Sequence, residues 1–328
     1  MAHSAAHLKK QNDPLRYAGN LAAAGAAVYL VISAALRVAA EWFVRVFHAS
    51  ATLQNPVSVP ESVVALLNLL LAAGGLWTAF CFIQKNATSQ MRPAILLTGL
   101  RDKHLWLFLP VFLGLGVLTN IGTSLLQKLL EKYTAYQMPV PAILPKGGFA
   151  LFVTFLAMCA VPAVLEEMLC RGAMQGILRR WGVWFSIVVS GTIFTLLHGD
   201  IAQMPGIFVL SLFLGLAAYA TNSLLPGMVL HFANNAVAFS FLLVQQKMDG
   251  VAALGFLLYL MAILCIGAAV CGGVIYQQKL LQTLRPIPRV YDVKNRQKRV
   301  TRLAKAPVFL GVLVLLSVYA CVPLFWKG

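Results

Sequence analysis

Charged side chains are scarce in this sequence. Asp, Glu, Lys and Arg together make up 11% of the 328 residues, against about 25% in soluble domains. Acidic residues are the scarcest, with 10 Asp and Glu against 26 Lys and Arg, while 60% of residues are hydrophobic. The shortage excludes an ordinary soluble globular protein. The basic residues stand between apolar runs, where they act as topology determinants, so we predict an integral membrane protein that binds no nucleic acid.

Several motifs of metal and nucleophile chemistry are also missing. The six cysteines lie in or beside apolar stretches and form no CxxC pair, so zinc or redox work is not indicated. No HExxH zinc-protease motif is present, and Ser190 and Ser211 lack a GxSxG context. We therefore predict no cofactor. No small-residue cleavage site follows the first apolar run, so we expect that run to remain as a span.

The apolar runs predict the fold. A helix needs roughly 20 apolar residues to cross a bilayer core of about 30 Å. Windows of about that size fall near 19–42, 62–84, 104–127, 148–178, 183–198, 204–222, 225–245, 251–275 and 307–326. The 183–198 run is short and could stop inside the membrane. We predict an all-α, polytopic transmembrane helix bundle of eight or nine spans.

Lys and Arg residues in alternate connections predict the orientation. They precede the first span, follow the second and the fourth, and fill the segment 279–305, so these connections and the N-terminus should be cytoplasmic. The connection 128–146 is discordant, because it is basic yet expected outside. Segment 279–305 is also a candidate contact for anionic lipid. We divide the chain into N-terminal spans (1–145), a core (146–245) and C-terminal spans (246–328), and expect a bacterial cell membrane.

Ionisable groups within the expected spans are the candidate functional residues. Each costs several kcal/mol in a bilayer unless it is paired or hydrated, which makes it a functional candidate by default. They gather in three short stretches, VPAVLEEMLCRG, IFTLLHGD and LHFANNAV. Because all three fall within about 70 residues of expected membrane helix, we expect them to form one site.

The two adjacent glutamates should have different roles. Glu167 and Arg171 are four residues apart, with the carboxylate on the N-terminal side that favours an ion pair. Glu166 points about 100° away around the helix. An apolar surround favours the uncharged form of a carboxyl group, which suits Glu166 to take a proton from water. A structural Glu–Arg cluster is the alternative interpretation.

The histidines extend this site. His198 follows Phe194 by one helical turn, and Asn235 follows His231 by one turn, so each pair shares a helix face. His231 and Asn235 could donate hydrogen bonds to an oxyanion. The turn at 180–182 should bring Glu166 and His198 to one depth, whereas His231 is naively shallower. A metal held by Glu166, His198 and His231 with a water is a chemical alternative.

Three motifs in order resemble a known family. They are EExxxR at Glu166 to Arg171, FxxxH at Phe194 to His198, and HxxxN at His231 to Asn235. This pattern is similar to that of the CAAX protease and bacteriocin-processing (CPBP) family of intramembrane glutamic endopeptidases. The motifs span about 166–235, and the outer spans carry no family signature.

The resemblance implies a mechanism and a class of substrate. Glu166 would activate a water with help from His198, and His231 and Asn235 would hold the oxyanion of the attacked peptide carbonyl. Glu167, Arg171 and Phe194 would support that geometry. The substrate would be a peptide or membrane protein, and the resemblance leaves open whether it is of CAAX type, of bacteriocin type or another peptide. A non-enzymatic immunity or scaffold protein and a proton-coupled transporter are the alternatives, although no repeat supports a transporter.

Overall fold

The structure is a computed structural model, and it describes residues 13–47, 59–89, 91, 97, 106–139, 142–248, 250–278 and 296–325. These residues form helices and connecting turns, with no strand among them. Eight helices within them are long and apolar enough to cross a membrane, judged by length and composition. The prediction of an all-α membrane bundle with eight or nine spans is therefore confirmed.

The helices follow the predicted windows closely. They are α2 (Pro14–Phe47), α3 (Glu61–Asn86), α4 (Phe108–Tyr133), a long helix from Gly148 to Trp181, α8 (Val183–Leu197), α9 (Met204–Thr221), α10 (Leu225–Lys247), α11 (Gly250–Gln277), α12 (Arg296–Ala304) and α13 (Pro307–Cys321). The run 183–198 was expected to be short, and α8 is indeed too short to count among the eight helices that could cross a membrane. At about 1.5 Å per residue, the long helix extends over roughly 50 Å and exceeds the thickness of a bilayer core.

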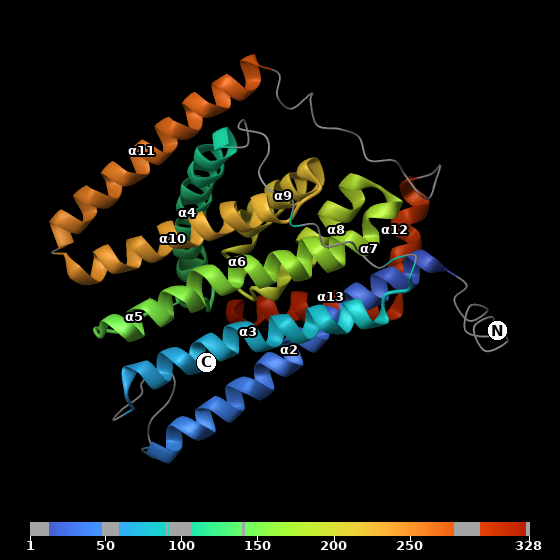
Figure 1. The fold of residues 1–328 in the computed structure, drawn as a ribbon, viewed down its shortest axis with the longest axis horizontal. Helices are drawn as coiled ribbons and strands as arrows, with labels where there is room; N and C mark the ends of the chain where they lie inside the picture. The colour runs from blue at the N-terminus through green and yellow to red at the C-terminus, as the bar shows by residue number, and fades with distance from the viewer. Residues whose placement is uncertain are drawn as a thin grey trace.

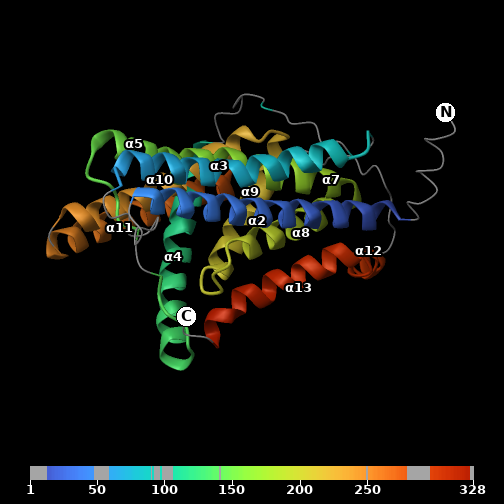
Figure 2. The same ribbon diagram turned by 90° about the horizontal axis from the view of Figure 1, so that it is seen from below.

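The long helix occupies the middle of the bundle (Figure 1). α2 and α3 lie side by side along one flank, and α8, α9 and α10 pack around the long helix from the other side. α4 runs across the direction of α2 and α3, as Figure 2 shows, and packs against α9 and α11. α13 lies against α2 and α8. The largest cluster of buried apolar residues joins α2, α3, the long helix and α8.

The long helix is interrupted by two π-helical stretches. Its segments are α5 (Gly148–Phe155), η2 (Leu156–Ala160), α6 (Val161–Glu166), η3 (Glu167–Met174), α7 (Gln175–Leu178) and the 3-10 turn η4 (Arg179–Trp181). Pro162, at the start of α6, has no N–H for a hydrogen bond along the helix. π-turns widen a helix locally and occur often at functional sites. No residue pattern predicted η3, which begins at the second glutamate.

Backbone geometry ends the long helix and starts α8 sharply. Gly182 has a φ of 128°, a conformation that residues with a Cβ rarely adopt. The chain therefore reverses here, and the predicted turn between the fourth and fifth apolar runs is confirmed. This antiparallel arrangement brings the end of α8 back toward the middle of the long helix.

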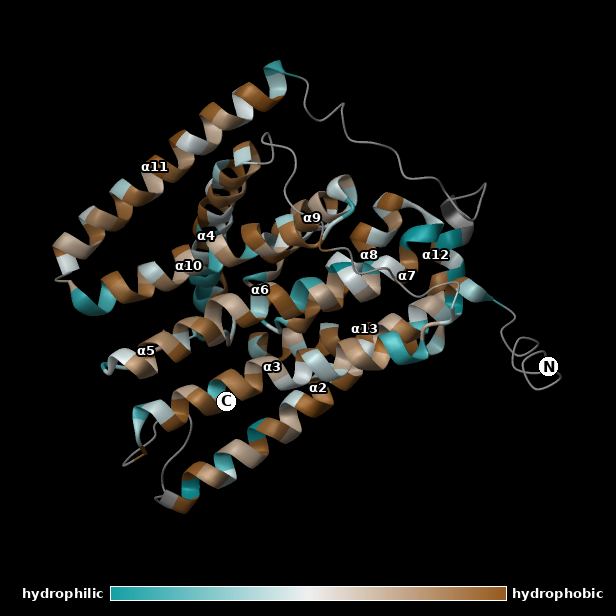
Figure 3. Cartoon of the chain, in the orientation of Figure 1, coloured by the Kyte–Doolittle hydropathy of each residue, from teal (hydrophilic) through white to brown (hydrophobic). Residues whose placement is uncertain are grey.

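Asp13, just before α2, and Arg302 of α12 meet at one end of the bundle. Arg302 of α12 donates to both oxygens of Asp13, with 2.8 Å between Nε and Oδ2. Burial of Asp13 acts to raise its pKa, but the Arg302 hydrogen bond and charge outweigh it and hold the pKa below the usual value. Figure 3 shows α12 as a hydrophilic helix among apolar ones. Several of the basic residues used to predict orientation, including those within 279–295, lie outside the described residues.

Candidate active site

Glu167 and Arg171 form the predicted ion pair inside the bundle. Arg171 Nη1 lies 2.9 Å from Glu167 Oε1, and both side chains are almost fully buried. Arg171 Nη2 also donates to the carbonyl and hydroxyl oxygens of Ser211, each at 3.1 Å. One turn on, Gln175 donates to the Gly215 carbonyl of the same helix, α9. These contacts fix the long helix against α9 and neutralise Glu167 locally.

His231 connects the two glutamates. Its Nδ1 lies 3.1 Å from Glu167 Oε1, and its Nε2 lies 3.7 Å from Glu166 Oε2. Gly227, one turn earlier on α10, permits this approach, because a Cβ there would lie 2.8 Å from Glu167 Oε2. The naive expectation that His231 lies shallower than the glutamates is therefore wrong. A hydrogen bond from Arg179 to Asn222 joins the turns of the two hairpins.

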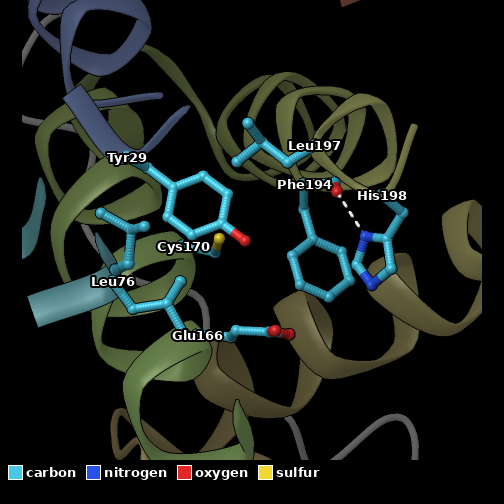
Figure 4. Close-up of a pocket in the computed structure, with 8 residues that line it drawn as sticks. Tyr29, Leu76, Glu166, Cys170, Phe194, Leu197 and His198 are labelled. Carbon is cyan, nitrogen blue, oxygen red and sulfur yellow. Dashed lines mark hydrogen bonds between the residues drawn. The ribbon is translucent and has the colours of Figure 1, made fainter. Parts of the chain in front are cut away.

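Glu166 faces a cavity of about 250 Å³. Figure 4 shows its carboxylate and the His198 ring directed into the same space. The sequence predicted that these two side chains lie close together at one depth, and both line this cavity. The other lining side chains are mostly apolar: Leu76, Leu169, Phe194 and Leu197, together with Tyr29 and Cys170. The site is thus a small apolar chamber with a carboxylate and an imidazole in its wall.

The orientation of His198 is set by its own helix. Its Nδ1 lies 2.9 Å from the Phe194 carbonyl oxygen (Figure 4). Because a carbonyl can only accept, Nδ1 carries the hydrogen and donates it. In the neutral ring, Nε2 is then an acceptor that is left for the cavity. The i,i+4 spacing of the FxxxH motif therefore fixes a tautomer as well as a helix face.

Phe194 packs against Arg171 and both histidines of the site. Its ring centroid lies 4.5 Å from the Arg171 guanidinium carbon. The rings of His198 and His231 meet it edge to face, with centroids 4.7 and 6.2 Å away. Cation–π and edge-to-face contacts of this kind contribute about 0.5–2 kcal/mol each. Phe194 thereby holds the two histidines apart and in fixed orientations.

A polar cluster secures the loop that follows His198. Gly199 has a φ of 71°, and a Cβ there would lie 2.7 Å from the Tyr319 ring of α13. Asp200 accepts hydrogen bonds from the Tyr136 hydroxyl at 3.1 and 3.2 Å and from Gln203 Nε2 at 2.7 Å. Burial first, and then the Asp200 charge and hydrogen bond, raise the pKa of Tyr136 to about 12. Neither Tyr136 nor Asp200 has a role predicted from the sequence.

Asn235 and the alternative metal site are less well supported by the geometry. Asn235 is half-buried on α10, one turn from His231, and does not line the cavity. Among the described residues, no three His, Cys, Asp or Glu side chains are grouped closely enough to hold a metal ion. The suggested set of Glu166, His198 and His231 is therefore not arranged as a ligand set.

Tyr29 is the main cavity residue that sequence reasoning missed. It belongs to α2, more than 130 positions before Glu166, and no motif marks it. Its position follows from helix packing, since a Cβ on Gly75 of α3 would lie 3.1 Å from the Tyr29 ring. A tyrosine in an apolar run has no periodicity or spacing that would separate it from a packing residue.

Fold and site together define a multi-pass integral membrane protein in which a buried cluster of Glu167, Arg171 and His231 lies beside a cavity lined by Glu166 and His198. Comparison with known families indicates the class of protein more narrowly than the fold does. Residues 148–237 match the family described as type II CAAX prenyl endopeptidase Rce1-like, which confirms the resemblance carried by the three motifs. This segment is thus similar to a family of CAAX-type intramembrane proteases. No curated protein and no solved structure matches the chain.

Proposed function

We propose that this protein is an intramembrane endopeptidase in which Glu166 activates a water molecule for attack on a peptide bond. The observation that carries the proposal is the cavity shared by the Glu166 carboxylate and the His198 ring. The family match to residues 148–237 supports peptide hydrolysis independently of that geometry.

Proton positions in the buried cluster support this role. Arginine stays protonated in proteins, so Glu167, which accepts from Arg171, is a carboxylate. His231 Nδ1 must then donate to Glu167, at 3.1 Å. A neutral His231 would turn its Nε2 lone pair toward Glu166, 3.7 Å away. We assign one further proton to the Glu166–His231 pair, because the four-residue cluster is then electrically neutral in its apolar surround.

This assignment of protons defines the form of the site that reacts. With the shared proton on His231, Glu166 is a carboxylate and His231 an imidazolium. A water in the cavity can donate to Glu166 and to Nε2 of His198, two acceptors from different helices. Its oxygen attacks the carbonyl carbon while Glu166 takes one proton. The tetrahedral intermediate collapses when that proton passes to the amide nitrogen and the C–N bond breaks.

The developing oxyanion needs donors near the carbonyl. His231 does not line the cavity, but as an imidazolium it offers an Nε2–H 3.7 Å from Glu166 Oε2, and we assign it the main oxyanion contact. Asn235, one turn along α10, would be the second donor, as the family motif implies. Glu167, Arg171 and Phe194 act through His231 and the helix positions and are positioning residues.

The substrate is a peptide or membrane protein that delivers an extended segment to the cavity. Four of the eight lining residues are Leu or Phe, so the chamber favours apolar side chains beside the cleaved bond. It is too small for a folded domain, which restricts cleavage to flexible segments.

Cleavage of a quenched peptide library by the purified protein in detergent tests the proposal. The wild type is compared with E166Q, which keeps the side-chain shape and removes the base, each with and without a strong chelator. We expect cleavage by the wild type, its loss in E166Q and no effect of the chelator. Full activity in E166Q would refute the base assignment, and loss with chelator would establish a metalloprotease.

A further inference from the structure

The Tyr29 side chain reaches the proposed site from outside the family-matched segment. It is half-buried on α2 and lines the cavity together with Glu166 and His198. Figure 4 shows its hydroxyl pointing into the cavity from the wall opposite Glu166. The segment that carries the family match starts at residue 148, so this contribution belongs to the N-terminal spans.

The chemistry of this wall makes the hydroxyl unusual. Apart from Glu166 and His198, the lining groups are aliphatic, aromatic or thiol. A hydroxyl in such a surround costs about 1–3 kcal/mol unless it finds a partner. Glu166 and His198 Nε2 both act as acceptors in the reactive form. Tyr29 therefore supplies the cavity wall with a neutral O–H donor from the opposite side.

The packing behind Tyr29 directs the ring inward. Gly75 of α3 allows α2 to approach, because a Cβ there would lie 2.0 Å from Ser33 Oγ and 3.1 Å from Tyr29 Cδ2. Tyr29 also packs against the main core cluster. A ring supported in this way loses little further freedom when its hydroxyl binds a substrate, which is the condition for a preorganised donor.

We propose that Tyr29 is a catalytic residue that donates a hydrogen bond to the oxyanion of the tetrahedral intermediate. The inference rests on the proposed peptidase function. When water attacks, the new C–O bond forms and the carbonyl π electrons move to oxygen. The phenol donates to that oxygen without losing its proton, and the donation weakens when the C–N bond breaks and the carbonyl is restored.

The test is steady-state cleavage of a peptide that the wild type cuts and E166Q does not. Y29F keeps the ring and removes the hydroxyl, and Y259F on α11, where Tyr259 is 66% exposed, is the matched control. Loss of one oxyanion donor lowers kcat about 100-fold. We expect that fall in Y29F, with KM within about twofold and an unchanged thermal unfolding temperature, and no change in Y259F.

A second variant separates the donor role from packing. Placing 3,5-difluorotyrosine at position 29 keeps the shape but makes the phenol more acidic. If Tyr29 donates in the transition state, the high-pH decline of kcat shifts to lower pH. Unchanged kcat in Y29F, a change in KM alone or an unshifted pH profile would each overturn the Tyr29 proposal while E166Q stayed inactive. Activity in E166Q, or no cleavage by the wild type, would remove the proposed function and this inference with it.

Discussion

The long helix from Gly148 to Trp181 and α11 are both apolar enough to cross a membrane, yet they differ in almost every other respect. The long helix carries Glu166, Glu167 and Arg171 at its middle and contains two π-helical stretches. α11 has no Asp, Glu, Lys, Arg or His, is uninterrupted, and has no buried residue in its most apolar window.

The difference shows what buried charge demands of a membrane helix. α11 is fixed mainly by close contact with α4, where a Cβ on Gly114 would lie 2.3 Å from Ala268 Cβ. Small residues that let backbones approach are the usual means of packing helices in lipid. The long helix needs partners on every side, since each charged group must be neutralised by α9, α10 or its own next turn. Substitutions should therefore act on chemistry or stability in the long helix region far more than in α11.

The largest effect is expected from His198→Ala. It removes the Nε2 acceptor that we assign to the attacking water, and loss of a positioned acid–base group lowers rates by about 100- to 10,000-fold. The measurement is kcat for a peptide that the wild type cleaves and E166Q does not. Thermal unfolding should change little, because His198 makes one hydrogen bond to its own helix. Retained activity would remove His198 from the mechanism.

Arg171→Met should cause the largest loss of stability. It leaves Glu167 charged and almost fully buried without its cation, and breaking a buried ion pair costs about 3–5 kcal/mol. Thermal unfolding in detergent measures it. Lys247→Ala, at the exposed end of α10, is the control and should lie within about 0.5 kcal/mol of the wild type. Equal behaviour of the two variants would contradict the neutralising role of Arg171.

Tyr136→Phe should have a moderate effect, transmitted through the loop after His198. It removes the hydroxyl that donates to Asp200, and hydrogen bonds to charged groups contribute about 1.5–3 kcal/mol. We expect a lower unfolding temperature and a reduced kcat with KM little changed. Tyr133→Phe, where the side chain is 68% exposed, serves as the control. A fall in stability with full activity would show that this loop does not position His198.

The smallest effect concerns the contact between Asp13 and α12. The pKa of Asp13 is lower in the folded protein than its ordinary value of 3.8. The stabilisation is therefore complete above that value and is lost as the pH falls below it through the lowered pKa. Because Arg302 is about a third exposed, we expect a loss of at most about 1 kcal/mol. Hydrogen exchange of α12 at pH 7 and pH 3 measures it, and Asp13→Asn should abolish the pH difference.

Much of the fold and part of the site could be predicted from sequence, for physical reasons. Apolar runs of bilayer length identify spans, and the window 225–245 lies within α10 with only two residues to spare at its end. The i,i+4 spacing of Glu167 and Arg171 predicted their ion pair correctly, because both residues lie on one helix. The positive-inside orientation and the three-part division of the chain stay predictions.

Contacts between distant segments could not be predicted in this way. The bridge from His231 to both glutamates depends on how α10 crosses the long helix and on the space left by Gly227. The π-turn at η3 depends on hydrogen bonds that no residue pattern here specifies. Tyr29 enters through the packing of α2 on α3, and a lone aromatic residue in an apolar run carries no signal of that.

The central claim is that the two adjacent glutamates have separate roles, with Glu166 reacting and Glu167 holding the structure. The most direct test measures peptide cleavage and thermal unfolding in parallel for E166Q and E167Q. The account predicts that E166Q loses cleavage and keeps the wild-type unfolding temperature, whereas E167Q unfolds at a clearly lower temperature because Arg171 and His231 lose their shared carboxylate. If instead E166Q retains cleavage, or E167Q is as stable as the wild type, the assignment of roles is wrong.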